Sequence, residues 1–141
     1  MKLIVVDGQG GGMGKAIAAQ MRKAFPKAEI LALGTNSAAT AAMLKGGATA
    51  GATGENAILS NCAAAEKEDY ILGTQGICLA DAMLGEISPA IAAAVSRSRA
   101  RKLLLPMSAC GVRVMGVTER ALSEYLREMT EAVGAPCGDG Q

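Results

Sequence analysis

The residues with the clearest potential for chemistry form a glycine-rich segment near the start of the chain, Asp7-Gly8-Gln9-Gly10-Gly11-Gly12-Met13-Gly14. Glycine allows left-handed backbone angles and close approach of a ligand to the main chain. A helix that begins at such a loop offers unpaired backbone N–H groups, which bind phosphate. The glycines could instead serve only a tight turn and close packing of a helix on a sheet. Five glycines within residues 8–14 exceed that need, so we predict a phosphate-binding loop.

The spacing of these glycines discriminates between types of nucleotide loop. The dinucleotide motif GxGxxG fails, because it would require glycine at Met13. The spacing GxxxGxG fits as Gly8, Gly12 and Gly14. With Lys15-Ala16-Ile17-Ala18 after it, the segment resembles the cofactor loop of short-chain dehydrogenases. That resemblance covers only the loop and the turn that follows, and it implies NAD(P) as the cofactor.

The catalytic part of the dehydrogenase pattern is missing. The Tyr-x-x-x-Lys signature is not found, because neither Tyr70 nor Tyr125 has a lysine at the required spacing. The stretch from Gly34 to Leu44 also holds no Asp or Glu for an adenosine ribose and no Arg for a 2′-phosphate. A small NAD(P)-dependent oxidoreductase is therefore an alternative and not the leading prediction.

The same residues partly match a P-loop, in which lysine reaches the terminal phosphates of a nucleoside triphosphate. Gly11-Gly12-Met13-Gly14-Lys15 supplies the lysine. Gln9 replaces the leading glycine of GxxxxGK, however, and Ala16 stands where a hydroxyl group should hold magnesium. A P-loop-like phosphoryl-transfer enzyme is a further alternative, and both enzymes would complete their site by oligomerisation.

Continuous apolar runs predict the strands that position this loop. Strands covered on both faces are predicted at 3–6, 30–33, 70–72 and 102–105. Residues 46–54 have no clear period and predict a loop, with a very short strand as an option. Val112 to Val117 alternates like a strand, and the short link before it favours an antiparallel edge. The predicted fold class is α/β, a Rossmann-like three-layer sandwich with a mostly parallel sheet and an antiparallel edge strand.

Helices are predicted between these strands from apolar spacing, capping residues and proline. They are a helix that ends before Pro26, an Ala-rich helix after Ser37, a helix over 55–65 capped by Thr53, a helical segment after Gly76, a helix opened by Ser88-Pro89 and a final helix capped by Thr118. The final helix places apolar side chains on one face.

Further polar turns follow predicted strands at Gly34-Thr35-Asn36-Ser37 and Gly73-Thr74-Gln75-Gly76, and Thr53-Gly54-Glu55-Asn56 extends the set. The carboxyl ends of parallel strands meet at one edge of a sheet, so we expect these turns beside the glycine loop. The residues predicted to bind a cofactor are Gly8, Gln9, Gly10, Gly11, Gly12, Met13, Gly14, Lys15, Gly34, Thr35, Asn36, Ser37, Gly54, Asn56, Gly73, Thr74 and Gln75.

Few residues qualify for catalysis. The candidates are Asp7, Lys15 and Glu55, and Asp81 and Glu86 rank below them because helix ends and surface charge also explain both. A carboxylate beside a phosphate repels it, so we expect Asp7 to order the loop or bind the ligand. The chain has no histidine, and its four cysteines form no CxxC pair. No metal site is predicted.

Length and charge limit the other possibilities. The 141 residues suit one nucleotide-binding domain over 1–133 with a flexible C-terminal tail over 134–141. A net charge of +1 provides no broad field for nucleic acid. We find no signal-like start and no apolar run of membrane-spanning length, and therefore expect a cytoplasmic protein with no membrane partner. Methionine and alanine on apolar helices favour a homo-oligomer, with a homodimer as the simplest form.

Several segments together resemble one uncharacterised bacterial family, catalogued as domain of unknown function 3842. The matching stretches are residues 7–15, Ala32-Leu33-Gly34-Thr35-Asn36-Ser37, Gly51-Ala52-Thr53-Gly54-Glu55-Asn56-Ala57-Ile58 and Met83-Leu84-Gly85-Glu86-Ile87-Ser88-Pro89. The chain departs from that pattern at Met107-Ser108-Ala109-Cys110, where the resemblance implies Asn and Arg before the cysteine. The resemblance implies no reaction, but its segments coincide with the strand-end turns selected above.

The leading functional hypothesis is a nucleotide- or dinucleotide-binding protein with a sensor or accessory role. Its partner would be a small phosphorylated ligand, a nucleotide or NAD(P), held by the loop at 8–14. A purely structural or protein-interaction domain, whose glycines serve only packing, is the remaining alternative.

Overall fold

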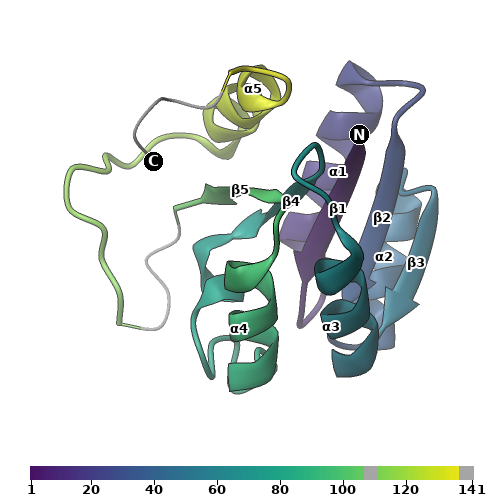
Figure 1. The fold of residues 1–141 in the computed structure, drawn as a ribbon. Helices are drawn as coiled ribbons and strands as arrows, with labels where there is room; N and C mark the ends of the chain where they lie inside the picture. The colour runs from purple at the N-terminus through teal and green to yellow at the C-terminus, as the bar shows by residue number, and fades with distance from the viewer. Residues whose placement is uncertain (107–110, 137–141) are drawn as a thin grey trace.

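The computed structural model describes residues 1–106 and 111–136. Its sheet has five strands: β1 (Lys2–Asp7), β2 (Glu29–Gly34), β3 (Ala50–Thr53), β4 (Tyr70–Thr74) and β5 (Arg101–Leu105). All pair in parallel, in the order β3-β2-β1-β4-β5 (Figure 1). This is the order of the first five strands in doubly wound dinucleotide-binding sheets. The predicted α/β, Rossmann-like class is confirmed.

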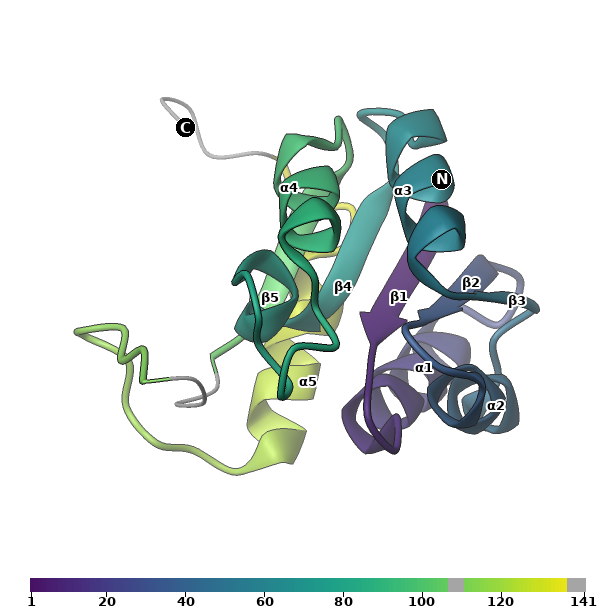
Figure 2. The same cartoon turned by 90° about the horizontal axis from the view of Figure 1, so that it is seen from below.

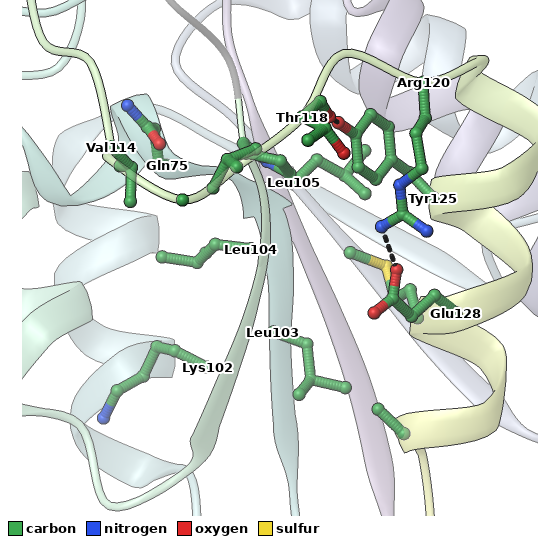
Figure 3. A pocket seen from close by; sticks show the side chains of 15 residues that line it. Gln75, Lys102, Leu103, Leu104, Leu105, Val114, Thr118, Arg120, Tyr125 and Glu128 are labelled. Carbon is green, nitrogen blue, oxygen red and sulfur yellow. Dashed lines mark hydrogen bonds and ion pairs between the residues drawn. The ribbon is translucent and has the colours of Figure 1, made fainter.

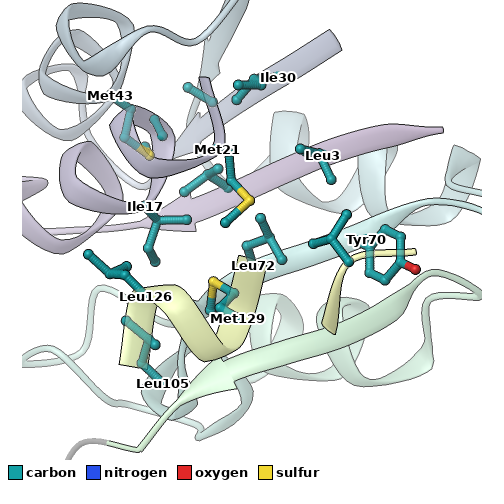
Figure 4. Packing of buried hydrophobic residues seen from close by; sticks show 14 of the residues in the cluster. Leu3, Ile17, Met21, Ile30, Met43, Tyr70, Leu72, Leu105, Leu126 and Met129 are labelled. Carbon is teal, nitrogen blue, oxygen red and sulfur yellow. The ribbon is translucent and has the colours of Figure 1, made fainter. Parts of the chain in front are cut away.

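Helices cover both faces of the sheet and make three layers (Figure 2). They are α1 (Gly12–Ala24), α2 (Ser37–Gly46), α3 (Glu55–Ala64), α4 (Pro89–Arg97) and α5 (Leu122–Ala132), with a short 3₁₀ helix, η1 (Gln75–Cys78), after β4. Helices α1, α2 and α5 pack against one face, where Figure 4 shows Ile17, Met43 and Met129 around the sheet. Helices α3 and α4 pack against the other face.

Burial on both faces of the sheet explains why the sequence of the central strand β1 is an unbroken apolar run over residues 3–6. Leu3 and Val5 of β1 join the core under α1, α2 and α5, whereas Ile4 and Val6 join the core under α3 and α4. All four side chains are fully buried. A central parallel strand has no solvated face, so neither set of positions carries a polar residue until Asp7 ends the strand.

The predicted antiparallel edge strand is wrong. Residues 112–117 form an exposed segment outside the sheet, and the sheet edges are β3 and β5. Alternation makes a strand only where one face becomes buried, and Val112 and Val114 both stay exposed. Gly116, with φ of +87°, also interrupts the extended conformation.

The optional short strand within 46–54 does form, as β3. Its signal was weak because an edge strand of small residues buries little, and three of its four residues are exposed. Pairing with β2 stabilises it, with Leu31 opposite Ala50 and Gly34 opposite Thr53.

Three predicted helix starts need correction. Gly54, with φ of +102°, is the N-cap of α3 in place of Thr53, and Ala121 precedes α5 in place of Thr118. The Thr118 carbonyl instead accepts a hydrogen bond from the Tyr125 hydroxyl. The helical segment after Gly76 is limited to the 3₁₀ turn η1. Ser88 is confirmed as a cap, because its Oγ accepts the Ile91 N–H at 3.2 Å and Pro89 follows it.

The first residues of the predicted tail are hydrogen-bonded to the sheet. The Gly134 N–H donates to the Tyr70 hydroxyl at 2.7 Å, and the Ala135 carbonyl accepts from Arg101 at 2.8 Å. The segment at 107–110, where the family resemblance departs, and the rest of the predicted tail at 137–141 lie outside the described residues. Among the helices that the structure describes, none is long and apolar enough to cross a membrane.

Candidate functional site

Sheet register brings the predicted strand-end turns together. Asp7 at the end of β1 lies opposite Gly34 at the end of β2, and Gly34 lies opposite Thr53 at the end of β3. Main-chain bonds continue the alignment beyond the strands, since the Thr35 N–H donates to the Asp7 carbonyl at 3.0 Å. The glycine loop and the turn after β2 are therefore neighbours.

Asp7 shapes the glycine loop. Its Oδ1 accepts the Gly8 N–H at 2.8 Å and its Oδ2 accepts the Gly14 N–H at 2.7 Å. The residue is 6% exposed, and burial raises the pKa of its carboxyl, while the two N–H donors oppose that rise. The carboxylate thus closes the turn between β1 and α1. Loop ordering is the role that the geometry assigns to Asp7, because both oxygens already accept main-chain bonds.

Packing and backbone angle explain three of the loop glycines. Gly11 has φ of +72°, and a Cβ there would lie 2.7 Å from the Cα of Ala39 on α2. A Cβ on Gly14 would lie 2.9 Å from the Cβ of Asp7, and one on Gly8 would lie 2.8 Å from the Thr35 hydroxyl oxygen. Gly11 and Gly14 let α1 approach α2 and β1 closely, and Gly8 leaves room for the turn after β2.

Gly10 and Gly12 have no such explanation. Apart from the adjoining main chain, no atom lies within 4 Å of the position that a Cβ would take on either residue, and neither has a positive φ. Both residues are exposed. The N–H groups of Gly10, Gly12 and Met13 have no hydrogen-bond acceptor within residues 1–106 and 111–136. The outer side of the loop therefore combines open space with free donors at the start of α1.

A carboxylate that the sequence ranking placed low, Glu86, reaches this loop. Its Oε1 accepts from the Gln9 N–H at 2.9 Å, from the Thr35 hydroxyl at 2.7 Å and from the Asn36 amide at 2.8 Å. These donors, Thr35 foremost, lower the pKa of Glu86. The Asn36 amide also donates to the Gln9 carbonyl at 3.0 Å, and its oxygen caps α2 at Ala39.

The segment at 79–88 folds back over the strand ends to deliver Glu86. Asp81, Met83 and Leu84 adopt left-handed φ values of 66°, 57° and 56°, which are uncommon for residues other than glycine. The Met83 sulfur packs at Gly8, 2.9 Å from the position of a Cβ there. Sequence signals for this contact were limited to Gly85 and the family-like stretch that contains Glu86.

The remaining predicted residues divide between this site and other places. Lys15 is exposed on the first turn of α1, and Ser37 is exposed at the start of α2. Glu55 accepts a hydrogen bond from Ser88, and its neighbours Gly54 and Asn56 lie at the start of α3. Gly73 and Thr74 are buried in β4. Gln75 lines a separate cavity.

That cavity, of about 560 Å³, lies between β5, the exposed segment after it and α5 (Figure 3). Leu104, Leu105 and Val114 contribute apolar walls. Arg120 lies over the Tyr125 ring and pairs with Glu128. A second hollow of about 420 Å³ adjoins it. No glycine-loop residue lines either space. Within the described parts of the chain, no group of three or more metal-ligating side chains is found.

The contrast between loop glycines predicts opposite effects of alanine. Gly11→Ala should lower the free energy of unfolding by about 2 kcal/mol or more, because it adds left-handed strain and a clash with α2. Gly12→Ala should leave it unchanged or raise it by about 0.5 kcal/mol, because the new methyl group meets open space. Urea unfolding measures both. Equal destabilisation would show that Gly12 also serves packing.

The hydrogen bonds to Glu86 predict a pH dependence. Because its folded pKa is lowered, its contribution to stability is fully present above about pH 5 and is lost as the pH falls through the folded pKa. Wild type should therefore exceed Glu86→Gln in free energy of unfolding most at about pH 7, and the gap should be smaller at about pH 3. Urea unfolding at both pH values tests this, and a gap independent of pH would contradict it.

Comparison with known proteins places the chain in a family without adding a reaction. No curated protein and no solved structure matches it. The family model described as "Domain of unknown function (DUF3842)" matches residues 2–137, which include the glycine loop, the turn after β2 and Glu86. The match spans nearly the whole sequence, and the chain belongs to the DUF3842 family.

Proposed function

We propose that this protein binds the phosphate group of a nucleotide or dinucleotide on the outer side of its glycine loop. The observation that carries the proposal is the pair Gly10 and Gly12, which neither packing nor backbone angle requires. A purely structural role leaves both unexplained. A ligand that must approach the main chain closely explains both, because any side chain there would stand in its way.

Local electrostatics support an anion at this place. The free N–H groups of Gly12 and Met13 lie at the start of α1, where the helix dipole favours negative charge. Lys15 supplies a cation on the first turn of the helix. Asp7 directs both of its oxygens to the N–H groups of Gly8 and Gly14 and so does not occupy the open side of the loop.

The topology supports the same place. In doubly wound sheets, ligands bind outside the carboxyl ends of the strands, where the strand order reverses. Here the chain runs outward from β1 to β2 and β3 on one side and from β4 to β5 on the other. The glycine loop follows β1, beside this reversal.

A binding role, as a sensor or accessory protein, is favoured over turnover. Both oxygens of Asp7 are engaged by the loop, Glu55 is paired with Ser88, and Lys15 lies on the solvent side of α1. Two of the three predicted catalytic candidates are therefore already engaged in hydrogen bonds within the protein, and the third is exposed. NAD(P) and other nucleotides remain the proposed ligands, and the cytoplasm remains the proposed location.

A second copy of the chain remains the proposed partner. Large apolar side chains are exposed in one segment, at Val112, Val114, Met115 and Val117. A run of this kind on a soluble protein commonly marks an interaction surface.

The binding test uses inorganic pyrophosphate and ADP as probes in isothermal titration calorimetry. Gly12→Ala should weaken both by about tenfold or more without loss of stability, because its methyl group enters the space of the phosphate. Lys15→Ala should weaken both by a smaller factor. Lys23→Ala, at the far end of α1, is the matched control and should leave both affinities unchanged.

The proposal is wrong if wild type binds neither probe at millimolar concentration. It is equally wrong if Gly12→Ala binds both as tightly as wild type does, because the ligand would then lie elsewhere.

A further inference from the structure

The turn after β2 lacks the acidic residue that dinucleotide-binding folds place there for a ribose hydroxyl. Thr35 and Asn36 occupy that position instead. In the structure both side chains bind Glu86, at 2.7 and 2.8 Å. A carboxylate is thus present at the end of β2, although it comes from a segment about fifty positions later in the chain.

The two oxygens of Glu86 differ in their surroundings. Oε1 accepts from Gln9, Thr35 and Asn36, whereas Oε2 has no donor within the part of the chain that the structure describes. No buried side-chain oxygen or nitrogen in that part lacks a partner, so Oε2 is open to solvent. Three donors on one oxygen fix the orientation of the carboxylate and leave the other oxygen free to accept.

The position of Glu86 links it to the phosphate site. Its bond to the Gln9 N–H places the carboxylate on the residue next to Gly10. A sugar attached to a phosphate at Gly10 and Gly12 would therefore lie within reach of Oε2. Ribose hydroxyls donate hydrogen bonds to a carboxylate, whereas a phosphate on the same hydroxyl would be repelled by it.

The segment that carries Glu86 is built to hold it there without a ligand. Its own main chain is closed by bonds from the Asp81 N–H to the Ile87 carbonyl at 2.7 Å and from the Ile87 N–H to the Ala82 carbonyl at 3.1 Å. Met83 anchors it at Gly8. The carboxylate is consequently in place before any ligand arrives, which lowers the cost of binding.

We propose that Glu86 selects ligands whose phosphate is attached to a ribose with a free 2′-hydroxyl group, and rejects those with a 2′-phosphate. This inference rests on the proposed phosphate site and adds the class of ligand to it. ADP-ribose and its 2′-phosphorylated form differ only in the group that Glu86 would read, so they are the probes of choice.

The experiment measures the affinities of ADP-ribose, 2′-phospho-ADP-ribose and inorganic pyrophosphate by calorimetry. Wild type should bind ADP-ribose about tenfold or more tightly than the 2′-phosphate form. Glu86→Gln keeps an acceptor for Gln9 and Thr35 but presents an amide in place of Oε2, so the preference should fall to about twofold or less. Asp81→Asn removes a charge from the same segment at an exposed position where asparagine tolerates the left-handed φ, and should keep the wild-type preference.

The affinity ratio of the two ADP-ribose forms is the decisive quantity, because both probes carry the same diphosphate. The probes differ in total charge, so Asp81→Asn measures how far loss of one negative charge by itself changes the ratio. Absence of a preference in wild type, or an unchanged preference in Glu86→Gln, overturns the role proposed for Glu86. If wild type still binds pyrophosphate, the proposed phosphate site is unaffected by that result. Tighter binding of all three probes by the same large factor in Glu86→Gln also overturns it, because Glu86 would then occupy the phosphate position itself. If pyrophosphate does not bind wild type, the phosphate site fails and the selection by Glu86 fails with it.

Discussion

The buried carboxylate of Asp7 is the constraint on which the glycine loop depends. It ends the central strand and binds the N–H groups at both ends of the turn, Gly8 and Gly14. That closure brings the start of α1 close to α2, where Gly11 passes Ala39 with no room for a side chain. It also leaves the N–H groups of Gly10, Gly12 and Met13 without an acceptor in the described parts of the chain. Replacing Asp7 would therefore disturb packing and the loop together, which makes it a poor probe of function alone.

A second interaction connects the loop to the rest of the strand-end edge. Asn36 caps α2 through its oxygen, while its amide nitrogen donates to the Gln9 carbonyl and to Glu86. One side chain thus couples the turn after β1, the turn after β2 and the segment at 79–88. The carboxylates of Asp7 and Glu86 therefore have different structural roles. Asp7 is turned inward to shape the backbone, and Glu86 is held at the surface with one oxygen free.

The sequence predicted the features that depend on local pattern. The apolar runs of β1 and β4 indicate strands that are buried on both faces. The glycine loop, the Ser88 cap and the parallel sheet were likewise predicted from residues close together in the chain. Features that depend on distant contacts were not predictable in this way. Glu86 meets Gln9 across 77 positions and Thr35 across 51, and Gly85 and the family-like stretch around it do not indicate which residues Glu86 contacts.

Edges of the sheet were misjudged for a related reason. Small residues form β3 because β2 offers a free edge, whereas Val112 to Val117 has the right alternation but leaves its side chains exposed. The pairing of β3 with β2 and the positive φ of Gly116 distinguish the two segments, not their propensity. Which loop glycines serve packing was equally beyond the pattern, because it depends on how closely Ala39 and Thr35 approach.

The most direct test of the phosphate site is an NMR titration of ¹⁵N-labelled protein with inorganic pyrophosphate, which follows each backbone amide separately. Binding at the outer side of the loop predicts that the largest shifts occur at the N–H groups of Gly10, Gly12 and Met13, with smaller shifts at Gly8 and Gly14, which are already bonded to Asp7. Saturable shifts confined to Gln75 and the cavity beside β5, or no saturable shift at all, would contradict the account.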